Sequence, residues 1–333
     1  MTTERKPILE IRGLRTQFFL REGVVTALDG IDLTLYEKES VGIVGETGCG
    51  KSMTAFSILR LVPHPGRITA GSIKFKGIEL TALTLEEMRT IRGRSISMIF
   101  QDPSTSLDPV FSIGNQLGEI ITLHQNVYDK ATLTTKVLEI LRLVRIAAPE
   151  SVIKQYPHEL SGGMKQRVMI ALALSCSPSL LIADEPTTAL DVTIQAQILR
   201  LLKDVVSKVG SSMMLITHNL GVVAETCDRV CIMYAGRIVE EAETFELFGK
   251  PMHPYTRGLL TAFPKLGEQK EELSVIRGTV PNLMNRFPGC SFVDRCDSAT
   301  DQCSRVRPKM AEVAPGHLVA CHLYPSGGEK DNA

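Results

Sequence analysis

The residues best suited to chemistry form a glycine-rich loop, where positions 45–52 read Gly-Glu-Thr-Gly-Cys-Gly-Lys-Ser after the apolar run 41–44. Glycines at this spacing let consecutive backbone N–H groups turn towards an anion. Lys51 can reach the β- and γ-oxygens of a nucleotide, and the Ser52 hydroxyl can hold Mg²⁺ where a helix begins. Since a strand is expected before the loop and a helix after it, the pattern predicts a nucleotide-phosphate site.

Two carboxylates directly follow a second apolar run, 180–183, as Asp184 and Glu185. At the carboxyl end of a buried strand, Asp184 is placed to hold Mg²⁺ through water, and Glu185 is placed to orient or deprotonate an attacking water. Paired acids are also common in solvated loops. Beside a phosphate loop, the catalytic interpretation is favoured.

Strands and helices must position these residues. The uncharged runs 180–183 and 213–217 predict buried strands, and apolar residues at helical spacing over 194–206 predict a helix between them, hence a parallel sheet in an α/β fold. Alternation over 8–44 predicts a partly exposed antiparallel sheet, and 230–240 predicts a hairpin. The segment 114–156 predicts a separate helical lobe.

Composition narrows the function classes. The chain has 333 residues, 44% of them hydrophobic, and its 37 Lys and Arg balance 37 Asp and Glu, so no overall positive field indicates a nucleic-acid binder. The longest apolar-rich stretch, 168–183, is short for a membrane span and contains Pro178. The N-terminus has no apolar segment typical of a secretion signal, so a cytoplasmic location is expected.

Four further motifs carry a resemblance to a known family. Residues 160–166, Leu-Ser-Gly-Gly-Met-Lys-Gln, resemble the signature loop of ABC-type ATPases and end 18 residues before Asp184. Gln101 resembles the residue of the Q-loop, 189–191 the D-loop, and His218 the switch histidine. The resemblance implies an ABC-type ATPase fold with a RecA-like parallel-sheet core, an antiparallel β subdomain and a helical subdomain.

The same resemblance implies a complete set of site residues for ATP and Mg²⁺. Glu185, His218 and Gln101 would be catalytic, and Ser52, Gln101 and Asp184 would hold Mg²⁺. An aromatic side chain, Phe18 or Phe19, would stack on adenine, although an aromatic residue in such a strand is as often part of the core. The nucleotide-contacting set would comprise Phe18, Gly45, Glu46, Thr47, Gly48, Cys49, Gly50, Lys51, Ser52, Met53, Ser161, Gly162, Gly163 and Asp191.

In this family the signature loop of one chain meets the γ-phosphate held by a second chain. Ser161 and the N–H groups of Gly162 and Gly163 begin a helix and so present a positive dipole end to an anion. Two ATPase subunits would therefore face each other head to tail with two ATP molecules between them.

Finer phrases, at 100–109, 156–164, 253–256 and 288–296, are similar to the ATP-binding subunits of oligopeptide and dipeptide importers. The resemblance implies an ATP-hydrolysing subunit that powers peptide import. Its partners would be a second ATPase subunit, a paralogue, two membrane permeases and, indirectly, an extracytoplasmic binding protein. It would lie peripherally at the cytoplasmic face of the inner membrane and bind no nucleic acid.

Two alternatives belong to other classes. A soluble non-transport ABC ATPase acting on nucleic acid or ribosomes is disfavoured by the charge balance and by the short span, about sixty residues, between Gln101 and Ser161. The other is a binding or sensor module whose function resides in the C-terminal cysteines.

Thr47 and Cys49 stand where the family usually has serines, and Cys49 would be open to oxidation or alkylation if exposed.

Cys290, Cys296, Cys303 and Cys321 cluster near the C-terminus. The paired C-x2-C spacing of zinc ribbons is absent, whereas four thiolates can hold an iron–sulfur cluster. Resemblance to relatives favours a [4Fe–4S] cluster; zinc and free thiols remain alternatives, and disulfides are disfavoured in the cytoplasm.

A rise in polarity predicts a domain boundary near 265. The nucleotide-binding domain would cover 8–265, with its helical lobe over about 102–160, and a cysteine-containing extension would cover 266–333.

Overall fold

The computed structural model describes residues 5–102, 106–188, 190–262, 276–279, 281, 283–284 and 287–324. These residues fall into two compact units. The first draws on segments 1–8, 35–40 and 76–216, and the second on 9–34, 41–75 and 217–333. The boundary predicted near 265 lies outside the described residues, so it stays a prediction.

Three parallel strands form the centre of the first unit. β7 (Leu180–Asp184) pairs in parallel with β6 (Ile96–Ile99) on one side and β8 (Ser212–Thr217) on the other. Every residue of the three strands is buried, which explains why the strands are mainly apolar rather than alternating. The charged residue among them is Asp184, at the end of β7. The helix α8 (Val192–Val209) joins β7 to β8, so the strand–helix–strand prediction is confirmed.

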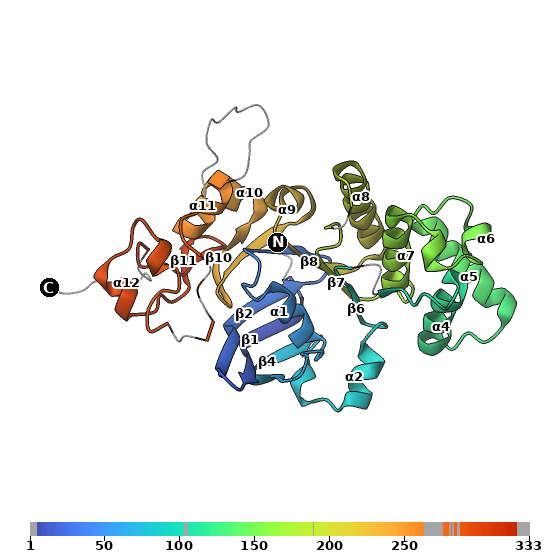
Figure 1. Cartoon of the computed structure of the whole chain (residues 1–333), viewed down its shortest axis with the longest axis horizontal. Helices are drawn as coiled ribbons and strands as arrows, with labels where there is room; N and C mark the ends of the chain where they lie inside the picture. The colour runs from blue at the N-terminus through green and yellow to red at the C-terminus, as the bar shows by residue number, and fades with distance from the viewer. Residues whose placement is uncertain are drawn as a thin grey trace. The chain divides into compact units, whose positions relative to one another are not determined.

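Helices α4 (Ile113–Gln125), α5 (Lys130–Leu143), α6 (Pro149–Val152) and α7 (Gly162–Leu174), with the 3₁₀ turn η2 (Pro157–Glu159), gather at one end of the first unit (Figure 1). Their apolar stripes, which include Leu117, Val137 and Leu141, are buried against one another. The same unit contains β5 (Ile78–Glu79), η1 (Leu80–Ala82) and α2 (Leu85–Ile91).

The second unit begins with an antiparallel sheet made of β2 (Gly23–Tyr36), β1 (Pro7–Leu20) and β4 (Gly66–Phe75), in that order. β1 pairs with β4 from Leu9 opposite Phe75 to Phe18 opposite Gly66. Helix α1 (Lys51–Ile58) packs on this sheet, where the hydroxyls of Thr16 and Ser57 lie 2.9 Å apart. The antiparallel sheet predicted for the N-terminal segment is thus confirmed.

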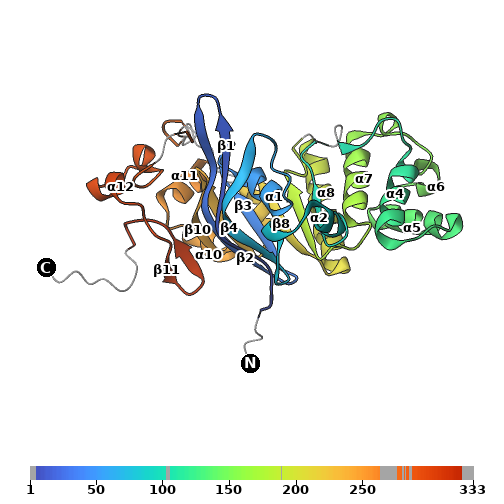
Figure 2. The ribbon, with the colours of Figure 1, turned by 90° about the horizontal axis from the view of Figure 1, so that it is seen from below.

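A second sheet of this unit continues into the C-terminal part of the chain (Figure 2). β3 (Ser40–Val44) pairs in parallel with β9 (Arg229–Tyr234), which forms the predicted hairpin with β10 (Arg237–Glu243). β10 then pairs with β12 (His317–Val319), and β12 with β11 (Ala311–Ala314). The helices and turns are α9 (Leu220–Thr226), α10 (Thr244–Gly249), α11 (Pro254–Ala262), η3 (Val293–Arg295) and α12 (Asp301–Arg305).

None of the helices within the described ranges combines the length and the apolar character that crossing a bilayer requires.

Candidate functional site

The phosphate loop follows β3 and leads directly into α1. Lys51 Nζ donates hydrogen bonds to the carbonyl oxygens of Gly45 (2.8 Å) and Glu46 (3.0 Å), so the loop closes around the lysine. Gly50 has φ 109°, and a Cβ there would lie 2.7 Å from the carbonyl oxygen of Ala27, so only glycine fits this position. Because Gly50 is also the N-cap of α1, no side chain covers the first N–H groups of the helix. This geometry suits a triphosphate held by backbone N–H groups and one lysine.

Cys49 is fully buried within this loop, and its carbonyl oxygen accepts a hydrogen bond from the N–H of Gly236 (2.8 Å). Burial raises the pKa of the Cys49 thiol above its ordinary value, although the nearby Lys51 opposes the shift. The thiol is therefore a packing group held in its protonated form, and the exposure that oxidation or alkylation would require is not found.

The two acids lie in the first unit, at the carboxyl end of β7. Asp184 ends the strand and is 3% exposed. Glu185 adopts a left-handed backbone conformation, φ 45°, and its N–H donates to the carbonyl oxygen of Ile216 (2.8 Å). Its Oε2 accepts hydrogen bonds from Gln101 Nε2 and from Thr188 Oγ1, both at 2.9 Å. Two donors thus fix the direction of this carboxylate.

Gln101 and Glu185 were both predicted from motifs, and the structure brings their side chains into contact. Thr188 was missed, although a hydroxyl three residues after a strand-end carboxylate is a signal for such a local hydrogen bond.

The signature loop and the D-loop residue mark the starts of two helices in the first unit. Ser161 is the N-cap of α7 and accepts a hydrogen bond from the N–H of Met164 (3.4 Å), while Asp191 is the N-cap of α8. The two helix starts pack closely, since a Cβ on Gly163 would lie 3.1 Å from the side chain of Ile194. Ser161 and Gly162 are exposed, so this positive helix end is open to an anion from outside the chain.

Two predicted nucleotide contacts lie in the second unit with the phosphate loop. His218 is exposed and directly follows β8. Phe18 shares one face of β1 with Thr16, the face on which α1 packs, because side chains two apart in a strand point the same way. Phe19 points to the opposite face, where the guanidinium of Arg67 lies 4.1 Å from its ring centroid. Of the two aromatic residues, Phe18 is the one on the side of the phosphate-loop helix.

The expectation of a [4Fe–4S] cluster is wrong. Cys290, Cys296, Cys303 and Cys321 line one small cavity, of about 110 Å³, but within the described part of the chain no group of three or more His, Cys, Asp or Glu residues could hold a metal ion. Burial raises the pKa of Cys290 to about 11 and also raises the pKa of Cys296 and of Cys321. All four are free cysteines, and the zinc alternative falls with the cluster.

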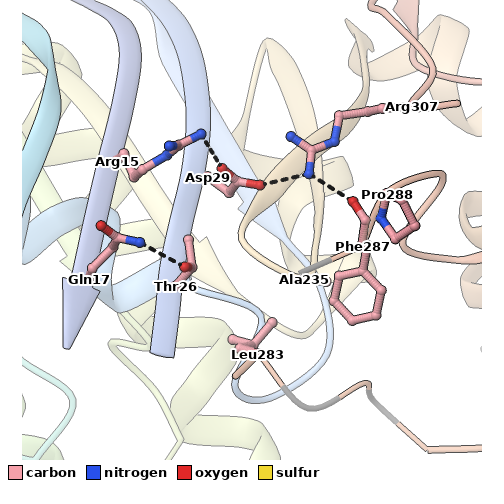
Figure 3. A pocket seen from close by; sticks show the side chains of 9 residues that line it. All are labelled: Arg15, Gln17, Thr26, Asp29, Ala235, Leu283, Phe287, Pro288 and Arg307. Atoms are coloured by element: carbon pink, nitrogen blue, oxygen red, sulfur yellow. Dashed lines mark hydrogen bonds and ion pairs between the residues drawn. The ribbon is translucent and has the colours of Figure 1, made fainter. Parts of the chain in front are cut away.

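A larger cavity, of about 530 Å³, lies in the second unit beside β1 and β2 (Figure 3). Asp29 forms ion pairs there with Arg15 (2.8 Å), Arg237 (2.7 Å) and Arg307 (3.1 Å). Burial alone would raise the pKa of Asp29, but the hydrogen bond from Arg237 and the charges of the three arginines lower it. Arg307 comes from the C-terminal part of the chain, so this cluster anchors that part to β2.

Two further residues at the phosphate loop escaped sequence reasoning. Arg295 forms an ion pair with the Glu46 carboxylate, and Tyr255 accepts a hydrogen bond from the Glu46 N–H through its hydroxyl (2.9 Å). Arg295 lies inside the phrase 288–296, but nothing in that phrase indicates contact with a loop about 249 residues earlier.

Comparison with known proteins gives consistent matches along the chain. Residues 28–188 match the family described as "ABC transporter", and residues 239–303 match "Oligopeptide/dipeptide transporter, C-terminal region". A probable peptide ABC transporter ATP-binding protein, y4tR of Sinorhizobium fredii, is 53% identical over 94% of both chains. The oligopeptide transport ATP-binding protein AppD of Bacillus subtilis is 47% identical over 98% of this chain and 99% of its own.

Solved structures agree with the fold. The ATP-binding cassette MJ0796, a dimer bound to ADP and Pi, superimposes with a TM-score of 0.64 at 26% identity, covering 71% of this chain and 98% of that chain. A structure of cbiO1 from Clostridium perfringens, part of the complex cbiONQ, superimposes with a TM-score of 0.63 at 26% identity, covering 74% and 92%. The predicted ABC-type α/β fold is confirmed.

Proposed function

The chain belongs to the ABC transporter family, as an ATP-binding subunit of its oligopeptide and dipeptide branch, and from this premise we propose how its residues drive peptide import. The observation that carries the proposal is the Glu185 carboxylate, which Gln101 and Thr188 hold in one direction at the end of a buried strand. A carboxylate fixed in this way suits the orientation and deprotonation of an attacking water.

Bound ATP supplies the γ-phosphoryl group that water attacks, and Mg²⁺ offsets its charge. Lys51 binds the β- and γ-oxygens, with backbone N–H groups of residues 45–53 around them. Ser52, Asp184 and Gln101 would hold Mg²⁺. The Gln101 amide nitrogen donates to Glu185, and the amide oxygen is the atom of this side chain suited to a metal. Phe18 stacks on adenine from the α1 side of β1.

Glu185 directs the water and takes its proton, and His218 contacts the γ-phosphate. The remaining contacts come from a second ATPase subunit, because Ser161, Gly162, Gly163 and Asp191 lie at helix starts whose positive ends suit a phosphate held elsewhere. Support comes from the exposure of Ser161 and Gly162 and from the dimeric state of MJ0796. The two ATPase subunits can be closed around ATP or open. Because ATP binds the closed pair of subunits better than the open pair, its binding supplies free energy for transport.

The full assembly in this proposal contains a second, paralogous ATPase subunit and two membrane permeases, which an extracytoplasmic binding protein supplies with peptides. The chain lies peripherally at the cytoplasmic face of the inner membrane. Residues 8–265 form the nucleotide-binding domain and 266–333 the extension. Relatives named for peptide, oligopeptide and dipeptide transport support this assignment.

The test is affinity purification of the complex from membranes through this chain, followed by peptide uptake into vesicles that contain the complex. We expect two permeases to co-purify and labelled di- or oligopeptides to enter only with ATP. The matched control is Glu185→Gln, for which uptake should stop while ATP still binds, since the loss of a general base costs about 10²–10⁴-fold in rate. Normal uptake by the Glu185→Gln complex, or a preparation without permeases, would contradict the proposal.

A further inference from the structure

The phosphate loop is held from outside by a residue of the C-terminal part of the chain. Arg295 Nη1 lies 2.7 Å from Glu46 Oε2, and its Nη2 lies 2.9 Å from Oε1, which is a two-pronged guanidinium–carboxylate pair. The Arg295 side chain is only 6% exposed and that of Glu46 25%. The pair is therefore largely shielded from solvent. Ion pairs that are exposed to solvent contribute little, so this shielding strengthens the interaction.

Arg295 is itself fixed in place. Its Nε donates a hydrogen bond to the carbonyl oxygen of Arg277 (2.8 Å), and its guanidinium lies 5.7 Å and 5.9 Å from the ring centroids of Tyr234 and Phe292. The hydrogen bond with Glu46 raises the pKa of Arg295, so the cation persists at any working pH. A positive charge is thus built into this position and does not depend on a flexible side chain.

The backbone of Glu46 connects the pair to the rest of the loop. Its N–H donates to the Tyr255 hydroxyl (2.9 Å), and its carbonyl oxygen accepts from Lys51 Nζ (3.0 Å). Tyr255 packs against Tyr234 and Phe292, with centroid distances of 4.6 Å and 5.4 Å. Phe292 and Arg295, at the N-cap and the end of η3, therefore support one residue of the phosphate loop from two sides.

We propose that Arg295 is a positioning residue for nucleotide binding, so that the C-terminal part of the chain completes the ATP site. Glu46 places a negative charge within a loop that must receive a polyanion. Unpaired, that charge would repel the triphosphate and disturb the carbonyl that holds Lys51; Arg295 neutralises it and fixes its direction. This inference rests on the proposed ATP site and adds a residue that the phosphate-loop motif does not contain.

The experiment uses the full chain and compares Arg295→Gln with a matched control, Arg307→Gln. Both substitutions remove an arginine of the C-terminal part of the chain that forms an ion pair with an earlier segment of the second unit. Asp29 keeps Arg15 and Arg237 when Arg307 is lost. We measure the equilibrium Kd for Mg-ATP by titration and, in the membrane complex, KM and kcat. Thermal unfolding of each variant is recorded in parallel.

For Arg295→Gln we expect Kd and KM to rise about tenfold, which corresponds to about 1.4 kcal/mol, with kcat at saturation within about twofold of the parent. Arg307→Gln should change Kd by less than about twofold. Equal Kd values for Arg295→Gln and the parent, or equal losses in the two variants, would overturn the proposal.

A second substitution tests whether the effect passes through Glu46. Glu46→Gln removes the charge but keeps the N–H and carbonyl used by Tyr255 and Lys51, so we expect the Arg295→Gln/Glu46→Gln double variant to recover Kd to within about threefold of the parent. A double variant that binds as weakly as Arg295→Gln would refute the proposal. If Arg295→Gln does not fold, Arg295→Lys replaces it, because lysine keeps the charge but cannot form both hydrogen bonds of the guanidinium. We expect Arg295→Lys to raise Kd about threefold, and an unchanged Kd would refute the proposal. Failure of the parent to bind ATP would instead refute the proposed function.

Discussion

At the scale of single residues, the proposed mechanism depends on how firmly the Glu185 carboxylate is held in one direction. One oxygen, Oε2, takes both hydrogen bonds, from Gln101 and from Thr188. Gln101 has a proposed second role at Mg²⁺, whereas the Thr188 hydroxyl donates to the Glu185 carboxylate and contacts the Glu185 carbonyl oxygen. Substitution of Thr188 therefore tests the orientation of the Glu185 carboxylate more directly than substitution of Gln101.

We predict that Thr188→Val lowers kcat about tenfold with KM for ATP nearly unchanged, because misdirection of a catalytic group costs rate without loss of substrate binding. Thr188→Ser, which keeps the hydroxyl, is the control and should retain most of the rate. Steady-state ATP hydrolysis by the membrane complex measures both. A Val variant with the parent's kcat would show that Gln101 alone orients Glu185.

At the scale of elements, a buried hydrogen-bonded pair of side chains joins β10 to β12. His317 Nε2 lies 2.7 Å from Glu240 Oε1, and both side chains are almost fully buried. Glu240 also accepts the N–H groups of Met252 and His253, so one carboxylate ties β10, β12 and the start of α11 together.

Loss of His317 would leave that buried carboxylate with fewer partners. We predict that His317→Ala lowers the free energy of unfolding by roughly 1–3 kcal/mol, the range for a buried group that loses a hydrogen-bond partner. Lys309→Ala, at an exposed site just before β11, should change it by less than about 0.5 kcal/mol. Urea denaturation followed by circular dichroism gives both values; equal effects would mean that the pair is not stabilising.

His253, at the start of α11, predicts a pH dependence of the same region. Burial, and secondarily the charge of Arg257, lowers the pKa of His253 from 6.5 to about 4. Its Nδ1 accepts the N–H of Tyr255, and the Glu240 carboxylate accepts its own N–H. Because the imidazole is neutral when folded, the unfolded chain binds more protons between these two pKa values.

Stability is therefore full above about pH 6.5, falls as the pH is lowered towards about 4, and loses at most about 3 kcal/mol on this account. We predict that His253→Gln flattens this slope, whereas His158→Gln, at an exposed histidine, does not. Denaturation midpoints at pH 7 and pH 4.5 check the prediction. An unchanged slope in His253→Gln would assign the acid sensitivity to other groups.

Elements with a strong local pattern were predictable from the sequence. The fully buried strands β7 and β8, the amphipathic α8 and the β9–β10 hairpin follow directly from runs of apolar residues and a Gly at the turn. β12 was not predictable, because it has three residues and its partner β10 lies far away in the sequence.

Motif residues were predictable for a related reason: loop chemistry at 45–52 and the strand-end acids are local. Arg295 was not, since its role depends on a contact that only folding creates. The cluster prediction for the cysteines was wrong because their number and spacing do not determine whether the folded chain brings them into a geometry that holds a metal, and the described residues contain no such group.

At the scale of the whole molecule, the proposed ATP site requires a partner subunit. The exposed helix start at Ser161 can complete an ATP site only if it meets a phosphate loop on another subunit, since the closed pair must bind ATP better than the open pair to do work. Peptide import and the assignment of Glu185 are both measured in this paired state.

The most direct test is ATP turnover by the purified membrane complex with the signature loop blocked in both ATPase subunits, through Ser161→Arg here and the equivalent substitution in the partner. Ser207→Arg, at an exposed site on α8, is the control. We predict that blocking both loops lowers kcat by about 100-fold or more, as expected when donors to the transferring phosphate are lost, while the control keeps its rate. Full turnover with both loops blocked would contradict the account.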